Sequence, residues 1–184
     1  MRGLVRVGAA VPSLALGNVK ENMKRHLAMM REAKEKHVSI VTFPELSLTG
    51  YTCGDLFFQR RLLDDVTDAL LALKDEMPEG ILAVVGAPLE IEGALYNCAV
   101  VLHKGEIISA VPKTFLPNNG EFYEKRWFQS GDARRDASVA IPKLKTDVCR
   151  QAIFETEDGV RFGIELCEDL WSALPPSTFH ALAG

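Results

Sequence analysis

Apolar residues along the first part of the chain alternate between strand-like runs and helix-like spacing. Residues 4–11 form a mostly apolar run that predicts a buried strand. Asn18 then offers a helix N-cap with Glu21 three residues later, and apolar residues at helical spacing predict a helix to about residue 36. Residues 39–43 form a second apolar run. A strand, a helix and a strand in this order favour a parallel pair of strands.

The remaining sequence continues this alternation and adds hairpins. Residues 64–77 predict a second amphipathic helix, residues 81–85 predict a third strand, and a last helix is expected to begin near Pro175–Pro176. Two further pairs of apolar segments flank turn-forming residues: residues 95–102 and 106–111 around His103-Lys104-Gly105, and residues 151–155 and 160–166 around Asp158-Gly159. Residues 116–144 are polar and irregular, which is typical of a functional connection. Strands alternating with helices predict an α/β layered fold.

Composition narrows the class of protein. The chain has 184 residues, 47% of them hydrophobic and 25% charged, which is ordinary usage for one globular domain. A net charge of -4 argues against a general nucleic-acid binder, although short basic clusters occur at residues 34–36 and at Arg134–Arg135. No apolar stretch approaches the roughly 18 residues of a membrane span, and the start lacks the pattern of a signal peptide. Four cysteines without a C-x-x-C pair favour free thiols in a reducing cytoplasm.

Three chemically active side chains follow predicted strands directly. Glu45 comes after an apolar run closed by Pro44, and Lys113 comes after another apolar run closed by Pro112. Cys167 comes after the apolar end of a third such segment. Ligands of layered α/β folds bind at the carboxyl ends of strands. We therefore hypothesise that a carboxylate, an ammonium and a thiol share one site.

The chemistry of such a site would be amide hydrolysis. A free thiol has a pKa near about 8.5, so a neighbouring carboxylate has to take its proton as the sulfur attacks an amide carbon. A lysine ammonium stabilises the oxyanion that forms, and the carboxylate then protonates the leaving nitrogen and activates water against the thioester. No metal or cofactor is required. Taken singly, each residue also has an ordinary structural interpretation: Glu45 as a helix-start acid, Lys113 as a solvated lysine and Cys167 as a small buried hydrophobe.

Three blocks of sequence carry a resemblance to a known family. Residues 43–46 (Phe-Pro-Glu-Leu), 112–118 and 163–171 resemble the signature blocks of the nitrilase, or carbon–nitrogen hydrolase, superfamily. The residues within these blocks, together with Leu48-Thr49-Gly50-Tyr51 and Glu121-Phe122-Tyr123-Glu124, most resemble the glutaminase domains of glutamine-dependent NAD⁺ synthetases. The resemblance covers essentially the whole chain.

The resemblance implies a fold and a set of roles. The fold would be an αββα nitrilase-type sandwich in which the three residues named above form the catalytic triad. Glu121 would orient Lys113, and Tyr51 and Glu168 would hold the amino-acid end of glutamine. Where the family generally has a tyrosine that lines the same pocket, this chain has Asn119, which can form hydrogen bonds but supplies no ring.

The resemblance also implies what lies outside the sequence. The superfamily domain runs past the nucleophile, and a synthetase domain that uses ATP and Mg²⁺ consumes the ammonia, so residues 1–184 would be a partial glutaminase domain. We expect glutamine as its substrate, the synthetase domain as its partner, self-association into a homo-oligomer, and weak or no turnover by this chain alone. The alternatives are another amidase or carbamoyl hydrolase of the superfamily, and an inactive scaffold.

Overall fold

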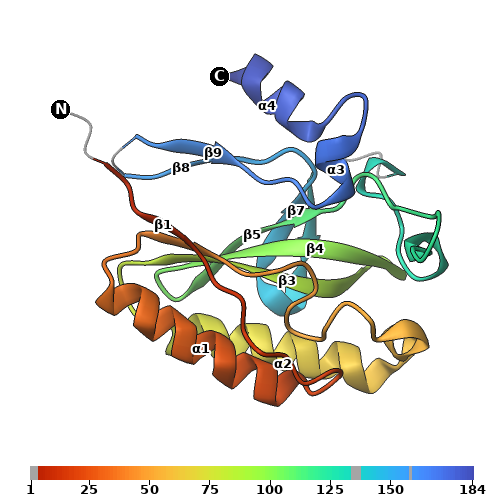
Figure 1. Cartoon of the computed structure of the whole chain (residues 1–184), viewed down its shortest axis with the longest axis horizontal. Helices are drawn as coiled ribbons and strands as arrows, with labels where there is room; N and C mark the ends of the chain where they lie inside the picture. Colours follow the sequence, from red (N-terminus) through yellow and green to blue (C-terminus); the bar gives the residue numbers. More distant parts are fainter. Residues whose placement is uncertain (1–3, 134–137, 158) are drawn as a thin grey trace.

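The computed structural model describes residues 4–133, 138–157 and 159–184, and Figure 1 shows their arrangement. Arg134–Arg135 and Asp158, which the sequence analysis singled out, lie outside the described residues. The strands are β1 (Val7–Ala9), β2 (Ile40–Thr42), β3 (Leu82–Ile91), β4 (Ala94–His103), β5 (Glu106–Pro112), β6 (Ser138–Ile141), β7 (Thr146–Cys149), β8 (Ile153–Glu155) and β9 (Arg161–Gly163). The α-helices are α1 (Val19–Glu35), α2 (Arg60–Glu76), α3 (Glu168–Trp171) and α4 (Pro176–Ala183), and the short 3-10 helices are η1 (Gly54–Phe58), η2 (Glu124–Arg126), η3 (Gly131–Ala133) and η4 (Pro142–Leu144).

A seven-stranded mixed sheet forms the centre of the molecule, in the order β1-β2-β3-β4-β5-β7-β6. Strands β1, β2 and β3 are parallel, so the predicted strand–helix–strand unit is confirmed. Strands β3, β4 and β5 are antiparallel neighbours. The β4–β5 hairpin turns at Lys104 and Gly105, which have φ of 50° and 77°, as its sequence predicts.

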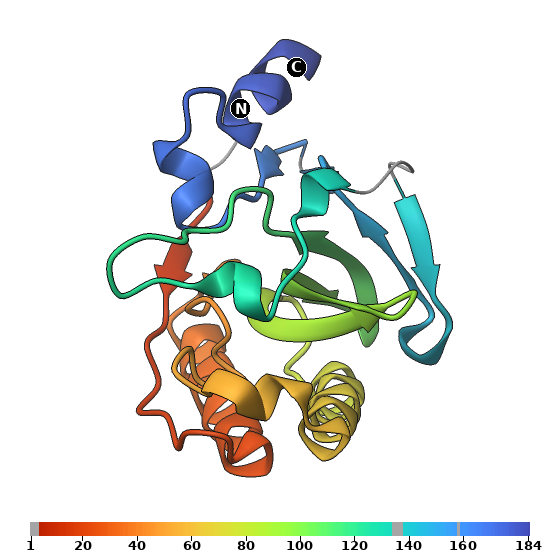
Figure 2. The ribbon, with the colours of Figure 1, turned by 90° about the vertical axis from the view of Figure 1, so that its right-hand side faces the viewer.

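Helices α1 and α2 cover one face of this sheet, where they form a separate layer in Figure 2. The Asn18 side chain accepts a hydrogen bond from the backbone N–H of Glu21, so the predicted N-cap of α1 is confirmed. The two helices bury one apolar stripe each against the sheet, through residues that include Leu27, Met30, Val66, Leu70 and Leu73.

The opposite face of the sheet carries a second, smaller layer. Strands β8 and β9 form an antiparallel two-stranded sheet, as predicted, and Phe154 of β8 packs with Val84 and Val101 of the central sheet. Helices α3 and α4 lie on the same side (Figures 1 and 2). The α/β layered fold class is therefore confirmed. No helix within the described residues is long and apolar enough to cross a lipid bilayer.

Several boundaries differ from the sequence prediction. Helix α2 begins at Arg60, four residues before the predicted start at Asp64, and β3 continues to Ile91 instead of ending at residue 85. Pro88 is accommodated because β2 pairs with β3 only as far as Val84 and the Leu48 N–H bonds to the Gly86 carbonyl, so Pro88 lies beyond both contacts on that edge of β3. Strand β7 was not predicted, and β6 lies in the segment interpreted as irregular.

Candidate active site

The turn that carries Glu45 is held against the sheet by a close backbone approach. The chain leaves β2 through Phe43 and Pro44, and Leu46 adopts a left-handed φ of 53°. A Cβ on Gly86 of β3 would lie 2.3 Å from the Leu46 nitrogen and 2.4 Å from the Pro44 carbonyl oxygen. Only glycine permits this approach. Gly86 therefore allows the turn to pack directly on β3 and sets the position of Glu45.

Helix α1 anchors the same turn from the other side. The buried Asn22 side chain donates to the Leu48 carbonyl at 3.0 Å, and the His26 Nε2 lies 2.8 Å from the Ser47 hydroxyl. Burial lowers the pKa of His26 to about 4, so the imidazole is neutral at pH 7. The ring also packs on Phe43, with ring centroids 4.4 Å apart. These contacts fix the backbone on both sides of Glu45.

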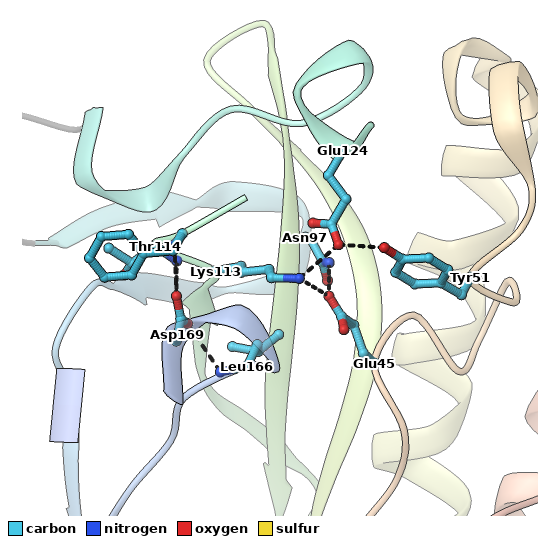
Figure 3. Close-up of polar contacts among 9 residues, drawn as sticks. Glu45, Tyr51, Asn97, Lys113, Thr114, Glu124, Leu166 and Asp169 are labelled. Carbon is cyan, nitrogen blue, oxygen red and sulfur yellow. Dashed lines mark hydrogen bonds and ion pairs between the residues drawn. The ribbon is translucent and has the colours of Figure 1, made fainter. Parts of the chain in front are cut away.

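Lys113 is a fully buried lysine held between two carboxylates. It follows the last residue of β5, and its backbone N–H donates to the Asn97 carbonyl oxygen at 2.8 Å. Its Nζ lies 2.6 Å from Glu45 Oε1 and 2.7 Å from Glu124 Oε1, as Figure 3 shows. Burial opposes the charge of this ammonium, but the two carboxylates outweigh that effect and raise the pKa of Lys113. Lys113 is therefore an ammonium at neutral pH.

The second carboxylate at Lys113 is Glu124, which corrects the expectation that Glu121 orients this lysine. Glu121 is exposed, in the turn closed by the Phe122 N–H to Asn119 carbonyl bond. Glu124 begins η2, and its side chain is 1% exposed. The sequence places two glutamates three positions apart, and only the turn and η2 decide which one points inward.

Burial and Tyr51 together shape the state of Glu124. Burial raises the pKa of Glu124, while hydrogen bonds from Lys113 and Tyr51 oppose that effect. Its other carboxylate oxygen, Oε2, is buried and has no hydrogen-bond partner among the described residues. The Tyr51 hydroxyl donates to Glu124 Oε1 at 2.6 Å. Burial and this hydrogen bond raise the pKa of Tyr51, so the phenol stays protonated. Tyr51, Glu124, Lys113 and Glu45 thus form one continuous polar chain (Figure 3).

Asn97 is a site residue that the sequence analysis missed. It lies in the middle of β4, is fully buried, and donates from Nδ2 to Glu45 Oε1 at 2.5 Å. Glu45 Oε1 therefore receives two donors, Asn97 and Lys113. The signal was present in the sequence, because a lone Asn interrupts the apolar run from Ala94 to Leu102 and a buried amide needs partners.

Cys167 lies at the junction of the β9 segment and α3, with φ of 44° and ψ of −101°. Positive φ at a residue other than glycine is a strained conformation that concentrates at functional sites. Cys167 and Glu45 line one cavity of about 290 Å³, together with Gly86, Ala99 and Leu166. Cys167 and Glu45 therefore line the same pocket.

The thiol is protonated in this environment. Burial and then the negative charge of Glu45 raise the pKa of Cys167, while Lys113 and the backbone N–H of Glu168 act in the opposite direction. All four cysteines of the chain are thiols, and Cys167 is the most exposed of them. An attack by this sulfur therefore requires a base, and Glu45 lies in the same pocket.

The three residues expected to bind substrate differ in their burial and in their contacts with the site. Tyr51 is partly buried and engaged with Glu124. Glu168 is partly buried at the first position of α3, directly after Cys167. Asn119 is exposed in the turn before Gly120, and no hydrogen bond within the described residues joins its side chain to the site. The structure brings Glu45, Lys113 and Cys167 together, with Tyr51 connected through Glu124.

Fold and site together define a layered α/β protein with a carboxylate–ammonium–thiol centre, in which Glu45 and Lys113 follow β2 and β5 and Cys167, expected at a strand end, instead lies four residues after β9 and directly before α3. The sequence pattern of the carbon–nitrogen hydrolase family matches residues 6–180, and the chain belongs to this family. Among curated relatives, the glutamine-dependent NAD(+) synthetase of Mycobacterium tuberculosis is 38% identical over 185 aligned residues. This match covers 99% of the chain, but the chain spans only 27% of that relative's length. The corresponding protein of Mycobacterium leprae is 34% identical, again over 27% of its length.

Solved structures show the same relationship. The glutamine-dependent NAD(+) synthetase from Cytophaga hutchinsonii superposes with a TM-score of 0.81 at 29% identity, over 89% of this chain and 28% of that one. An amidase from Nesterenkonia superposes with a TM-score of 0.69 over 90% of this chain and 56% of that one; at 17% identity it shows the fold alone. The nitrilase-type fold expected from the sequence is confirmed.

Proposed function

We propose that this chain hydrolyses the side-chain carboxamide of glutamine to glutamate and ammonia through a thioester on Cys167. The observation that carries the proposal is the buried Lys113 ammonium, 2.6 Å from Glu45, which in turn lines one pocket with the strained Cys167. An ammonium with no solvent exposure is costly to bury, and a developing oxyanion is the charge it suits.

The two oxygens of Glu45 have different tasks in this proposal. Asn97 and Lys113 both donate to Oε1. Oε2 is then the oxygen that takes the proton from the Cys167 thiol as sulfur attacks the amide carbon. An ammonium has three N–H donors. Lys113 gives one to Glu45 and one to Glu124, so the third is available to the substrate carbonyl oxygen as it becomes an oxyanion.

Collapse of the tetrahedral intermediate completes the first half of the reaction. Glu45 returns its proton to the amide nitrogen, the C–N bond breaks, and ammonia leaves with a thioester remaining on Cys167. Glu45 then takes a proton from water as the oxygen attacks the thioester, and it returns this proton to sulfur as the C–S bond breaks, which releases glutamate and restores the thiol and the carboxylate. The steps draw on side chains of this chain alone, without a metal or cofactor.

The names of the relatives support glutamine as the substrate. The curated relatives described above are called glutamine-dependent NAD(+) synthetases, and this chain spans about a quarter of their length. We propose that Glu168, beside the nucleophile, binds the α-ammonium of glutamine, since a carboxylate suits an ammonium. Asn119 would approach the same end of the substrate.

We propose that Tyr51 acts on the substrate indirectly, through Glu124 and Lys113, to which its hydroxyl is connected by hydrogen bonds. The ammonia would feed a synthetase segment of a longer protein in a reducing cytoplasm, where the Cys167 thiol persists. Association with further copies of the chain stays a prediction, which sedimentation analysis of the purified chain tests.

The test is detection of the acyl-enzyme. The chain is incubated with glutamine, quenched in acid and digested, and the Cys167 peptide is weighed by mass spectrometry while glutamate and ammonia are measured. We expect a glutamyl thioester on Cys167 with slow release of both products, and neither in Cys167→Ala. Glu45→Gln should slow thioester formation by about 10²- to 10⁴-fold, the usual contribution of a general base.

A matched pair of variants tests the corrected assignment of the second glutamate. Glu124→Gln should slow thioester formation strongly because it removes a carboxylate 2.7 Å from Lys113, and Glu121→Gln should not, because Glu121 is exposed. A thioester from a simple primary amide such as propionamide, with none from glutamine, would identify a different amidase. If neither substrate forms an adduct on Cys167, the proposed chemistry is refuted.

A further inference from the structure

Asp169 joins the two segments of the site that no side-chain ion pair connects. Lys113 and Cys167 are 54 positions apart in the sequence and arrive from different layers of the fold. Lys113 is linked by its ammonium to Glu45 and Glu124. These ion pairs do not hold the segment before Cys167, so another contact has to fix its distance from Lys113.

The Asp169 carboxylate lies between these two segments. Its Oδ1 accepts from the backbone N–H groups of Thr114 at 3.0 Å and Phe115 at 2.7 Å, directly after Lys113. Its Oδ2 accepts from the backbone N–H of Leu166 at 3.0 Å, directly before Cys167. Figure 3 shows Asp169 reaching toward Thr114 on one side and Leu166 on the other. One carboxylate therefore binds both neighbouring backbones.

Burial makes this arrangement unusual. Asp169 is 1% exposed, so its carboxylate has left water for three backbone donors. Burial raises the pKa of Asp169, while the three N–H groups and the nearby Lys113 ammonium oppose that effect. Hydrogen bonds from backbone N–H to a charged carboxylate are stronger than those between neutral groups. A carboxylate used only to begin a four-residue helix would not need donors from a loop 54 positions away.

We propose that Asp169 is a positioning residue that sets the distance between the Lys113 ammonium and the Cys167 sulfur. It touches neither the substrate nor the reacting atoms. Its effect on catalysis rests on the proposed function, but the backbone contact itself does not. A displacement of about 1 Å between reacting groups can cost on the order of 100-fold in rate. Loosening this contact should therefore slow chemistry with little change in the fold.

Asp169→Asn is the sharpest perturbation. The amide has the same shape, but its NH₂ group replaces one accepting oxygen, so either Leu166 or the Thr114–Phe115 pair faces a donor instead. Ser172→Ala is the matched control, because it removes a hydrogen bond from the C-cap residue of α3 to the Asp169 backbone carbonyl and leaves the carboxylate untouched. Circular dichroism establishes that both variants are folded.

Two separate readouts should change in Asp169→Asn. Formation of the glutamyl thioester should slow by about 10- to 100-fold, because the sulfur is displaced from Lys113 and Glu45. The pH midpoint for alkylation of Cys167 by iodoacetamide should fall toward that of an ordinary exposed thiol. It falls because the thiol moves away from the Glu45 charge and from the partial burial that raise its pKa; Lys113 and Glu124 are the other charged groups that act on it. Ser172→Ala should change neither by more than about twofold.

Amide hydrogen exchange of the unmodified chain tests the contact independently of any reaction. The N–H groups of Thr114, Phe115 and Leu166 should exchange with one common protection factor, because one carboxylate holds all three. Exchange of the Leu166 N–H at least tenfold faster than that of the other two would overturn the proposal. The proposal would also be overturned if folded Asp169→Asn formed the thioester at the wild-type rate and kept the wild-type pH midpoint of alkylation. Common protection with no thioester in the wild type would instead refute the proposed function and leave the contact intact.

Discussion

Replacing Lys113 by methionine should destabilise the fold through the two carboxylates it leaves behind. The lysine side chain is fully buried, and it lies 2.6 Å from Glu45 and 2.7 Å from Glu124. Methionine fills similar volume but removes the only positive charge that the structure places against both carboxylates. Removing one partner of a buried ion pair costs about 3–5 kcal/mol. We expect a loss of this size in the free energy of unfolding at pH 7, a large part of a typical domain's stability of about 5–15 kcal/mol.

The pH dependence of this loss identifies its cause. Without the ammonium, only the Tyr51 hydrogen bond opposes the burial that raises the pKa of Glu124, so the folded variant binds a proton at higher pH than the unfolded chain does. A group whose pKa is higher in the folded than in the unfolded state stabilises the fold at low pH, and this contribution is lost as the pH rises. The destabilisation should therefore shrink between pH 7 and pH 5. The double variant Lys113→Met/Glu124→Gln removes the buried charge itself and should recover more than half of the loss.

Urea unfolding followed by circular dichroism at pH 7 and pH 5 measures these differences. Lys104→Met is the matched control, since Lys104 is an exposed lysine paired with Glu157 and should have little effect. A loss of stability in Lys113→Met no larger than that of the control would contradict an uncompensated buried charge. So would a double variant no more stable than the single one, because residues in direct contact must be energetically coupled.

Three further predictions follow from the residues around Glu45. His26 has a pKa of about 4 in the folded chain and about 6.5 in the unfolded chain, so its contribution to the free energy of unfolding is fully present above pH 6.5. As the pH falls toward 4, the free energy of unfolding should fall by about 3 kcal/mol, and urea titrations of His26→Gln should lack this loss. Gly86→Ala should abolish thioester formation, because its Cβ would lie 2.3 Å from the Leu46 nitrogen; retained activity would contradict the close approach. Asn97→Ala should lower the free energy of unfolding by about 1.5–3 kcal/mol, the value of a hydrogen bond to a charged acceptor, and an unchanged urea midpoint would argue against its bond to Glu45.

Local sequence signals determined much of the architecture. The apolar period of 3.6 in residues 19–35, closed at its start by Asn18, predicted α1. Turn-forming residues predicted the β4–β5 and β8–β9 hairpins, whose strands pair as expected. These features depend on neighbouring residues only, which is why sequence reasoning reaches them.

The remaining features depend on approach between distant segments. Whether Glu121 or Glu124 meets Lys113 is decided by a turn and a 3-10 helix that pack on the site, and no local period encodes that choice. The extension of β3 past Gly86 depends on ten consecutive pairs with β4. Asp169 acquires its three donors only after two loops have met. Such contacts are properties of the assembled fold.

Labelling of Cys167 with a glutamine analogue that carries a chloroketone in place of the carboxamide tests most directly whether the three groups act as one site. Exposure alone favours Cys167 over the buried Cys53 and Cys98, so selectivity among cysteines is not sufficient. We predict that the analogue modifies Cys167, that glutamine slows the modification while equimolar glutamate does not, and that Glu45→Gln slows it at least tenfold. Equal rates with and without glutamine, and in Glu45→Gln, would contradict the account.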